Sequence, residues 1–152
     1  MKERTERSSI YAIAGPTASG KTALGVELAL RIGGEVVNFD SVQIYKGIKL
    51  ATAKPSTEEM RGVPHHLIDY VDPNVNYTAA DWASDASAKI VEIEGRGNVP
   101  ILVGGTGFYL RTLRQPLFDS PKTDAALREK LRAEHKEHGP EYLHQMLAKL
   151  DP

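Results

Sequence analysis

The chain has 152 residues, of which 41% are hydrophobic and 26% are charged, and its formal net charge is -1. This composition is typical of a soluble globular protein with a sizeable core, and the small net charge excludes recognition of nucleic acid through global basicity. Cysteine is absent, which excludes disulfides and thiolate metal sites, and no apolar stretch reaches the length of a membrane span or a signal sequence, so we expect a cytoplasmic protein.

Apolar runs alternate with longer amphipathic segments in the first three quarters of the chain, a pattern typical of an α/β protein with a parallel sheet and flanking helices. In chain order the pattern predicts a strand at residues 9–14, a helix at 21–32, a strand at 35–39, a short helix at 57–61, a short strand at 66–68, a helix at 78–94, a strand at 99–103 and a brief helix that ends at 113.

Two of these helices carry clear signals. The first has apolar side chains at helical spacing, namely Leu24, Leu28 and Ile32, and Gly33 and Gly34 follow as stop signals. Thr78 is a plausible N-cap of the long helix, with Asp81 three residues later. The apolar face of the long helix consists of Trp82, Ala86, Ile90 and Ile93, and we expect Trp82 to be a core anchor.

The composition changes after residue 114. Residues 115–122 are a connector punctuated by prolines, and residues 124–138 and 141–150 are predicted to form two charged amphipathic helices separated by Gly139 and Pro140. We therefore divide the chain into an incomplete α/β core at residues 1–114 and the beginning of a helical insertion at residues 115–152. The sequence stops after these helices without a closing element, so we expect a piece of a longer chain.

The first strand runs into a sequence that matches the pattern G-x-x-x-x-G-K-[ST] at every fixed position: Gly15, Pro16, Thr17, Ala18, Ser19, Gly20, Lys21 and Thr22. In such a phosphate-binding loop (P-loop), successive backbone N–H groups and the N-terminus of the next helix point at phosphate oxygens. Lys21 supplies a positive charge and the Thr22 hydroxyl can bind Mg²⁺. The motif predicts a P-loop NTPase-like fold, but it does not separate kinases, NTPases and transferases that release diphosphate.

Two more sequences follow predicted strands, where ligands of an open parallel sheet bind. Asp40, Ser41, Val42 and Gln43 follow the second strand, and Asp40 is either a functional carboxylate or the cap of a turn. Residues 104–107, Gly-Gly-Thr-Gly, follow the last strand, and they allow a ligand to approach the backbone unless they form an ordinary glycine-rich turn.

Taken together and in this order, the sequences GPTASGKT, DSVQIY, PHHLID and LVGGTGFYLR resemble the tRNA dimethylallyltransferase family, also called tRNA isopentenyltransferases. The resemblance runs from about residue 10 to residue 111, and the helical segment looks like the start of the tRNA-binding insertion of the family. The chain thus resembles an N-terminal portion of such an enzyme. The resemblance implies transfer of the dimethylallyl group of dimethylallyl diphosphate to the exocyclic amine of an adenosine 3′ of the tRNA anticodon, with Mg²⁺ as cofactor.

The resemblance also implies a role for individual residues. Asp40 is the expected general base, Thr106 is expected near the reacting atoms, and Thr22 is the expected metal ligand. Diphosphate binding is assigned to Gly15, Pro16, Thr17, Ala18, Ser19, Gly20, Lys21 and Thr22. Contact with the tRNA anticodon stem-loop is assigned to Asp40, Ser41, Val42, Gln43, Thr106 and Arg128. No obligate protein partner is expected.

Other residues near these motifs are open to a simpler interpretation. Adjacent histidines on a strand point to opposite faces, so we expect His65 and His66 to make structural hydrogen bonds rather than to share a metal. Asp69 either serves Mg²⁺ through water or caps a loop. Phe108 replaces the leucine that is usual in the family, a change that repacking should tolerate.

Three other functions compete with tRNA modification. An adenylate isopentenyltransferase would prenylate free adenine nucleotides, a small-molecule kinase would use the same loop to hold a nucleotide, and a regulatory module would only bind nucleotide. If the 152 residues are tested alone, we expect weak or absent transfer with some diphosphate binding.

Overall fold

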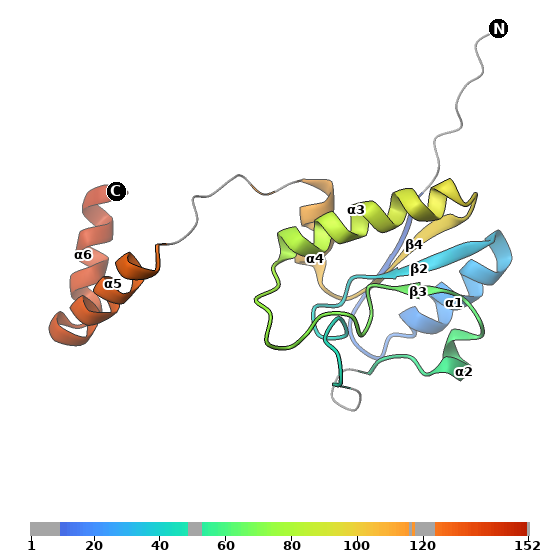
Figure 1. Ribbon diagram of the computed structural model, residues 1–152, viewed down its shortest axis with the longest axis horizontal. Coiled ribbons are helices and arrows are strands. Elements are labelled where there is room, and N and C mark those ends of the chain that lie inside the picture. The colour runs from blue at the N-terminus through green and yellow to red at the C-terminus, as the bar shows by residue number, and fades with distance from the viewer. Residues whose placement is uncertain (1–9, 49–52, 116, 118–123, 152) are drawn as a thin grey trace, which may run out of the picture. The chain divides into compact units, whose positions relative to one another are not determined.

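The structure is a computed structural model that describes residues 10–48, 53–115, 117 and 124–151. It consists of two compact units, Met1–Leu117 and Phe118–Pro152. The first unit is an α/β core and the second is a pair of helices (Figure 1). The division lies close to the boundary that we drew after residue 114.

The core contains a four-stranded sheet in which every pairing is parallel. The strands are β1 (Tyr11–Ala14), β2 (Gly34–Asn38), β3 (His65–His66) and β4 (Val99–Gly104), in the order β1-β4-β2-β3. The helices of the core are α1 (Lys21–Ile32), α2 (Thr57–Met60), α3 (Ala79–Gly95) and α4 (Gly107–Arg114). Helix α1 packs on one face of the sheet and α3 on the other (Figure 1), which confirms the predicted α/β fold.

The bounds of the strands differ from the prediction by a residue or two at their ends. Strand β2 already begins at Gly34, which pairs with Val99 and where a Cβ atom would lie 2.6 Å from Ile101 Cδ1, so this glycine is part of the sheet rather than only a stop signal. The predicted strand at 66–68 is wrong beyond His66, because Leu67 has a φ of 57° and leaves the extended conformation. The predicted start of β1 at residue 9 lies outside the described residues.

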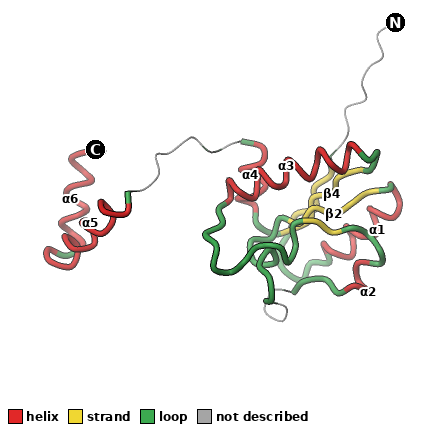
Figure 2. Tube along the Cα trace, in the orientation of Figure 1, coloured by secondary structure: helices red, strands yellow, loops and turns green. Residues whose placement is uncertain are grey.

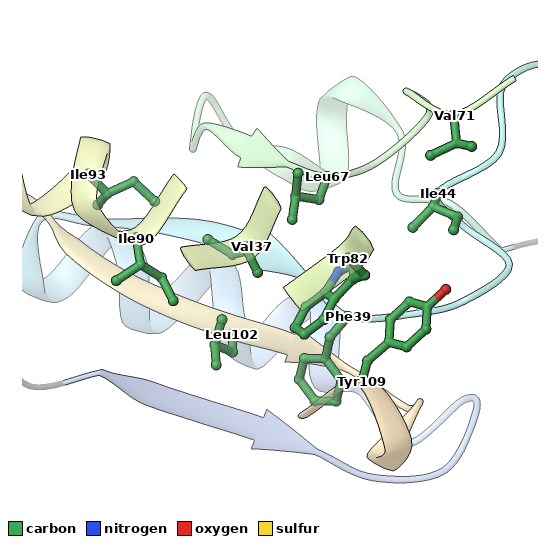
Figure 3. Packing of buried hydrophobic residues seen from close by; sticks show 11 residues of the cluster. Val37, Phe39, Ile44, Leu67, Val71, Trp82, Ile90, Ile93, Leu102 and Tyr109 are labelled. Atoms are coloured by element: carbon green, nitrogen blue, oxygen red, sulfur yellow. The ribbon is translucent and has the colours of Figure 1, made fainter. Parts of the chain in front are cut away.

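Helix α3 forms as its sequence predicts. Thr78 and Asp81 make a reciprocal capping box, and the predicted apolar face is buried. Trp82 is fully buried, stacks on Tyr109 with 5.0 Å between ring centroids, and donates its Nε1–H to the Asn38 carbonyl oxygen at 3.0 Å. Figure 3 shows these two rings beside Phe39, which confirms Trp82 as an anchor of the core.

Helix α1 has the predicted bounds, but of its predicted apolar face only Leu28 packs on the core, whereas Leu24 and Ile32 are exposed. The buried residues of this helix are Gly25, Val26 and Ala29. Leu24 is 58% exposed, whereas a Cβ atom on Gly25 would lie only 2.7 Å from Val103 Cγ2. Small residues therefore form the packed face, because they let the helix approach β4 closely. This packing holds the N-terminus of α1 near the carboxyl ends of the strands.

The second unit consists of α5 (Ala125–His138) and α6 (Pro140–Leu150), which confirms the two predicted helices. Asp124 caps α5 by accepting the Ala126 N–H at 2.8 Å, and Gly139 separates the helices. None of the described residues of α5 and α6 is buried. Among the described residues of the whole chain, no helix is both long and apolar enough to cross a membrane.

Candidate functional site

The P-loop connects β1 to α1 and presents backbone donors. Ala18 and Gly20 have φ angles of 61° and 80°, and the left-handed conformation of Ala18, which alanine rarely adopts, costs about 1 kcal/mol or more. The first turn of α1 has neither a side-chain cap nor an acidic residue, so its N–H groups and positive dipole end are available to an anion. Lys21 Nζ donates to the Pro16 carbonyl oxygen within the loop.

One cavity of about 510 Å³ joins the loop to the other predicted motifs. The residues that line it at the carboxyl ends of the strands are Thr17, Ala18, Ser19, Gly20, Lys21, Thr22, Asn38, Asp40, Val42, Gln43, Gly104 and Gly105. The long loops that follow β2 and precede α3 are visible in Figure 2. The structure thus places the phosphate-binding loop, the carboxylate after β2 and the glycine-rich turn after β4 around one cavity.

Asp40 caps a turn and also lines the cavity. Its Oδ1 atom accepts the backbone N–H groups of Val42 at 2.9 Å and Gln43 at 3.3 Å, so it caps the turn that follows β2. Its Oδ2 atom would lie 4.0 Å from a Cβ atom on Gly105 and is directed at the glycine-rich turn. Capping fixes the carboxylate and leaves its second oxygen for a ligand.

Thr106 is bound to the turn that carries Asp40. Its Oγ1 atom accepts the Ser41 N–H at 2.9 Å and lies 3.1 Å from the Ser41 hydroxyl oxygen. Its own N–H donates to the Phe39 carbonyl oxygen at 3.2 Å. Gly104 and Gly105 line the cavity beside it, and a Cβ atom on Gly104 would lie 2.6 Å from the Phe39 carbonyl carbon, so only glycine fits there.

The remaining residues that we assigned to RNA are differently placed. Gln43 Nε2 donates to the Ala53 carbonyl oxygen at 3.1 Å, so its amide already has a partner, whereas the Val42 side chain is 48% exposed. Arg128 lies on α5 in the second unit, where it lines a groove of about 460 Å³ with Leu127 and Leu131. The structure brings Asp40, Ser41, Val42, Gln43 and Thr106 together in the core, whereas Arg128 belongs to the second unit.

The cavity suits a Mg²⁺ ion that would be held mainly by the phosphate oxygens of a bound substrate. The Thr22 hydroxyl is on the first turn of α1 and Thr22 lines the cavity. The described residues contain no group of three or more His, Cys, Asp or Glu that could hold a metal ion. Mg²⁺ usually keeps several waters and takes phosphate oxygens as ligands, so one hydroxyl from the protein fits this ion. Asp69 bonds to Lys54 and to the Gly47 N–H at 3.2 Å, and this favours the loop-anchoring interpretation of Asp69.

The two histidines make separate structural contacts, as predicted. His65 Nδ1 bonds to the Val63 carbonyl oxygen at 2.9 Å, and because a carbonyl cannot donate, this nitrogen carries the hydrogen. His65 Nε2 is buried and has no hydrogen-bond partner among the described residues. Burial lowers the pKa of His65. His66 Nε2 bonds to Glu35 at 2.5 Å.

Sequence reasoning missed Asn38 as a cavity residue. Its side-chain amide donates to the Leu67 carbonyl oxygen at 3.0 Å, and its backbone carbonyl accepts the Trp82 indole N–H. Asn38 thereby joins the wall of the cavity to the core and to the segment after β3. The signal was present, because Asn38 is the last residue of β2 and ligands of an open parallel sheet bind at the carboxyl ends of its strands.

Comparison with known proteins shows what the chain is similar to. The sequence model described as IPP transferase matches residues 43–152. The tRNA dimethylallyltransferase of Geobacter metallireducens is 55% identical over 152 residues, which are 100% of this chain and 49% of that protein. The tRNA dimethylallyltransferase of Anaeromyxobacter dehalogenans is 51% identical over 92% of this chain and 47% of its own length. The chain therefore spans about half the length of these relatives.

Solved structures lead to the same family. The full-length tRNA isopentenylpyrophosphate transferase from Bacillus halodurans superposes with a TM-score of 0.73 at 44% identity, covering 96% of this chain and 48% of that one. A eukaryotic dimethylallyltransferase acting on tRNA gives a TM-score of 0.80 at 34% identity, covering 96% of this chain and 36% of that one.

Proposed function

The chain belongs to the IPP transferase family, and on that premise we propose that it forms the catalytic core of a tRNA dimethylallyltransferase. The substrates would be dimethylallyl diphosphate and an adenosine 3′ of the anticodon in a tRNA stem-loop. The observation that carries this proposal is the single cavity that the P-loop and Asp40 both line. With a tRNA substrate the protein would act in the cytoplasm, and the proposed reaction requires no protein partner.

The P-loop would hold a leaving group in this reaction. The exocyclic amine of adenosine attacks the allylic carbon, the C–O bond to the diphosphate breaks, and negative charge builds on the departing oxygen. Lys21 would move from the Pro16 carbonyl to the phosphate, and the amides of residues 17–22 would donate to its oxygens. Mg²⁺ held beside Thr22 would neutralise further charge on the diphosphate.

Asp40 would take the proton that the amine loses. The amine is a weak nucleophile because its lone pair is delocalised into the ring, so removing this proton as the C–N bond forms assists the reaction. Positioned general bases typically contribute a factor of about 10² to 10⁴. Since Oδ1 is held by two backbone N–H groups and Oδ2 is directed at the glycine-rich turn, we assign the proton to Oδ2.

The acceptor base would have to leave the stack of the anticodon loop to reach Asp40, which amounts to base flipping. Val42 and Gln43 stand at the same cavity and would contact the neighbouring RNA. Arg128 on α5 would contact the phosphate backbone of the tRNA.

Calorimetric titration with dimethylallyl diphosphate tests the first step. We expect binding that requires Mg²⁺ and that Lys21→Ala weakens at least about a hundredfold, because a charged contact to phosphate is lost. Lys89→Ala is the matched control, since Lys89 forms only a surface pair with Glu92 on α3. Equal binding by the Lys21→Ala protein, or binding without Mg²⁺, would contradict the proposal.

Competing functions are separated by the choice of acceptor. The chain is incubated with Mg²⁺ and dimethylallyl diphosphate, with either an anticodon stem-loop RNA or AMP, under single-turnover conditions. Preference for AMP would indicate an adenylate isopentenyltransferase, and phosphate transfer from radiolabelled ATP would indicate a kinase. Binding of nucleotide with no binding of dimethylallyl diphosphate would indicate a regulatory module.

A further inference from the structure

Three hydrogen bonds tie the glycine-rich turn to the turn that carries Asp40, and two of them involve Ser41. The Thr106 N–H donates to Phe39, the Ser41 N–H donates to Thr106 Oγ1 at 2.9 Å, and the two hydroxyl oxygens lie 3.1 Å apart. The bonded residues are chain neighbours of Asp40 and Gly105, which line the cavity. The three bonds therefore hold the Asp40 turn against the glycine-rich turn.

We propose that Ser41 is a positioning residue for the transfer reaction, whose amide and hydroxyl hold the Thr106 side chain and so fix the Asp40 turn against the glycine-rich turn. This inference rests on the proposed function. It differs from the role that the family resemblance implied for Ser41, because the Ser41 amide donates to Thr106 Oγ1 and the Ser41 hydroxyl oxygen accepts the Thr106 hydroxyl, so Ser41 acts on a neighbouring residue of the protein.

The chemistry of the hydroxyl groups supports this assignment. A threonine hydroxyl has one hydrogen and two lone pairs, and the Ser41 N–H takes one lone pair. The bond between the hydroxyls then fixes where the Thr106 hydrogen points. Ser41 therefore determines both the position of the Thr106 side chain and the direction of its hydroxyl group, and Thr106 directly follows the lining residue Gly105.

Packing leaves these turns little room to compensate for a lost bond. Gly104 lies against the Phe39 backbone, and Phe39 is fully buried beside Trp82 and Tyr109. Ser41 and Thr106, both half-buried, form the remaining contact between the turns. Losing their contact would shift Asp40 relative to Gly105, and small displacements of a catalytic group slow a reaction more than they weaken substrate binding.

A double-mutant cycle tests the inference. We expect Ser41→Ala to lower the single-turnover transfer rate about three- to tenfold, as one neutral hydrogen bond is lost. Thr106→Val should lower it further, and the double variant should match Thr106→Val alone, because Ser41 acts through Thr106. Thr106→Ser, which keeps the hydroxyl, should restore most of the rate.

The dissociation constants of dimethylallyl diphosphate and of the stem-loop RNA should not change in Ser41→Ala. Ser87→Ala on α3 is the matched control, since that hydroxyl bonds only to its own helix.

A second measurement reports on the contact without any activity. The Ser41 amide should be protected from hydrogen exchange in the unaltered chain and in Ser41→Ala, and should lose protection in Thr106→Val. The inference would be overturned by any of three results. These are additive effects of the two substitutions on the transfer rate, a weaker affinity of Ser41→Ala for the stem-loop RNA, and a Ser41 amide that is unprotected in the unaltered chain. A chain that does not bind dimethylallyl diphosphate but has a protected amide would count against the proposed function, whereas normal transfer by Ser41→Ala would count only against the role of Ser41.

Discussion

Strand β2 carries a carboxylate at each end, and the two differ in what surrounds them. Glu35, near the amino end, is 3% exposed and accepts hydrogen bonds from Arg96, at 2.8 Å and 3.2 Å, and from Asn98 at 2.7 Å, in addition to its contact with His66. The Arg96 hydrogen bond is the main cause that lowers the pKa of Glu35 to about 2. Side chains from β3, from the end of α3 and from the turn before β4 thus meet at this carboxylate.

Asp40, just past the carboxyl end, has far fewer partners. Backbone N–H groups of its own turn hold Oδ1, and within the described part of the chain Oδ2 has no hydrogen-bond partner. The amino end of the sheet therefore uses its carboxylate to join elements, whereas the carboxyl end keeps one oxygen for a ligand. The comparison separates a carboxylate that joins elements of the fold from one that lines the cavity and that we propose as the general base.

Replacing Asp40 by Asn should give the largest effect. The asparagine oxygen can still accept the N–H groups of Val42 and Gln43, so the free energy of unfolding should change by less than about 1 kcal/mol. The transfer rate should fall by a factor of about 10² to 10⁴, because an amide cannot take the proton. Single-turnover transfer and urea unfolding together check this.

Asp72→Asn provides the control for that experiment. Asp72 also caps its own turn, by accepting the Asn74 N–H at 2.8 Å, and it does not line the cavity. Its substitution should leave the transfer rate unchanged. If Asp40→Asn unfolds the protein or retains the full rate, the two ends of β2 do not differ in the way that we describe.

Much of this contrast could be predicted from the sequence. The glycines, Lys21 and Thr22 are adjacent in the chain and have a fixed pattern, so the P-loop was identified directly. The position of Asp40 followed from the rule that parallel strands end at one edge of a sheet. Helix α3 was also predicted correctly, because its capping residues and apolar face are local features.

What the sequence did not predict depends on contacts between distant residues. Glu35 was treated only as the start of a strand, since Arg96 and Asn98 lie 61 and 63 positions away. The packed face of α1 was predicted only in part because large apolar residues were counted, whereas Gly25 fits against Val103. The bond between Ser41 and Thr106 spans 65 positions and has no local signal.

Glu35→Gln should give the second largest effect, and it should fall on stability. An uncharged amide loses the charged hydrogen bonds to Arg96 and leaves its own N–H groups facing donors, so we expect a loss of about 2 to 3 kcal/mol in the free energy of unfolding. Binding of dimethylallyl diphosphate to the folded variant should not change. Urea unfolding and calorimetry at neutral pH check both parts.

The pH dependence identifies Glu35 as the cause. Because its pKa is lowered from 4.5 to about 2 in the folded chain, its contribution to stability is complete above pH 4.5 and is lost as the pH falls towards 2. The stabilities of the unaltered chain and Glu35→Gln should therefore converge as the pH falls through this range. A constant difference between them would show that the lost stability does not come from the charge of Glu35.

Gly104→Ala should have a smaller effect, on the wall of the cavity itself. The added methyl group would lie 2.6 Å from the Phe39 carbonyl carbon, which belongs to rigid backbone. We expect a loss of about 1 to 3 kcal/mol in the free energy of unfolding and weaker diphosphate binding, since overpacking shifts the turn. Gly107→Ala is the control, because a Cβ atom there meets nothing within 4 Å. Equal stability of the two variants would refute the close approach.

Substitution of His65 should give the smallest effect. His65 pairs with Val36 of β2 and also lines the cavity, so it lies between Glu35 and Asp40 along this strand. Burial lowers the pKa of His65 in the folded chain, so the unfolded chain takes up a proton at higher pH than the folded one. Its contribution to stability is therefore present above pH 6.5, the usual value, and is lost as the pH falls below it. His65→Gln should unfold with a flatter pH dependence between pH 7 and pH 5.5, whereas His144→Gln, at an exposed position on α6, should behave like the unaltered chain. An unchanged slope in His65→Gln would mean that the imidazole titrates alike in both states, and that its buried nitrogen has found a partner.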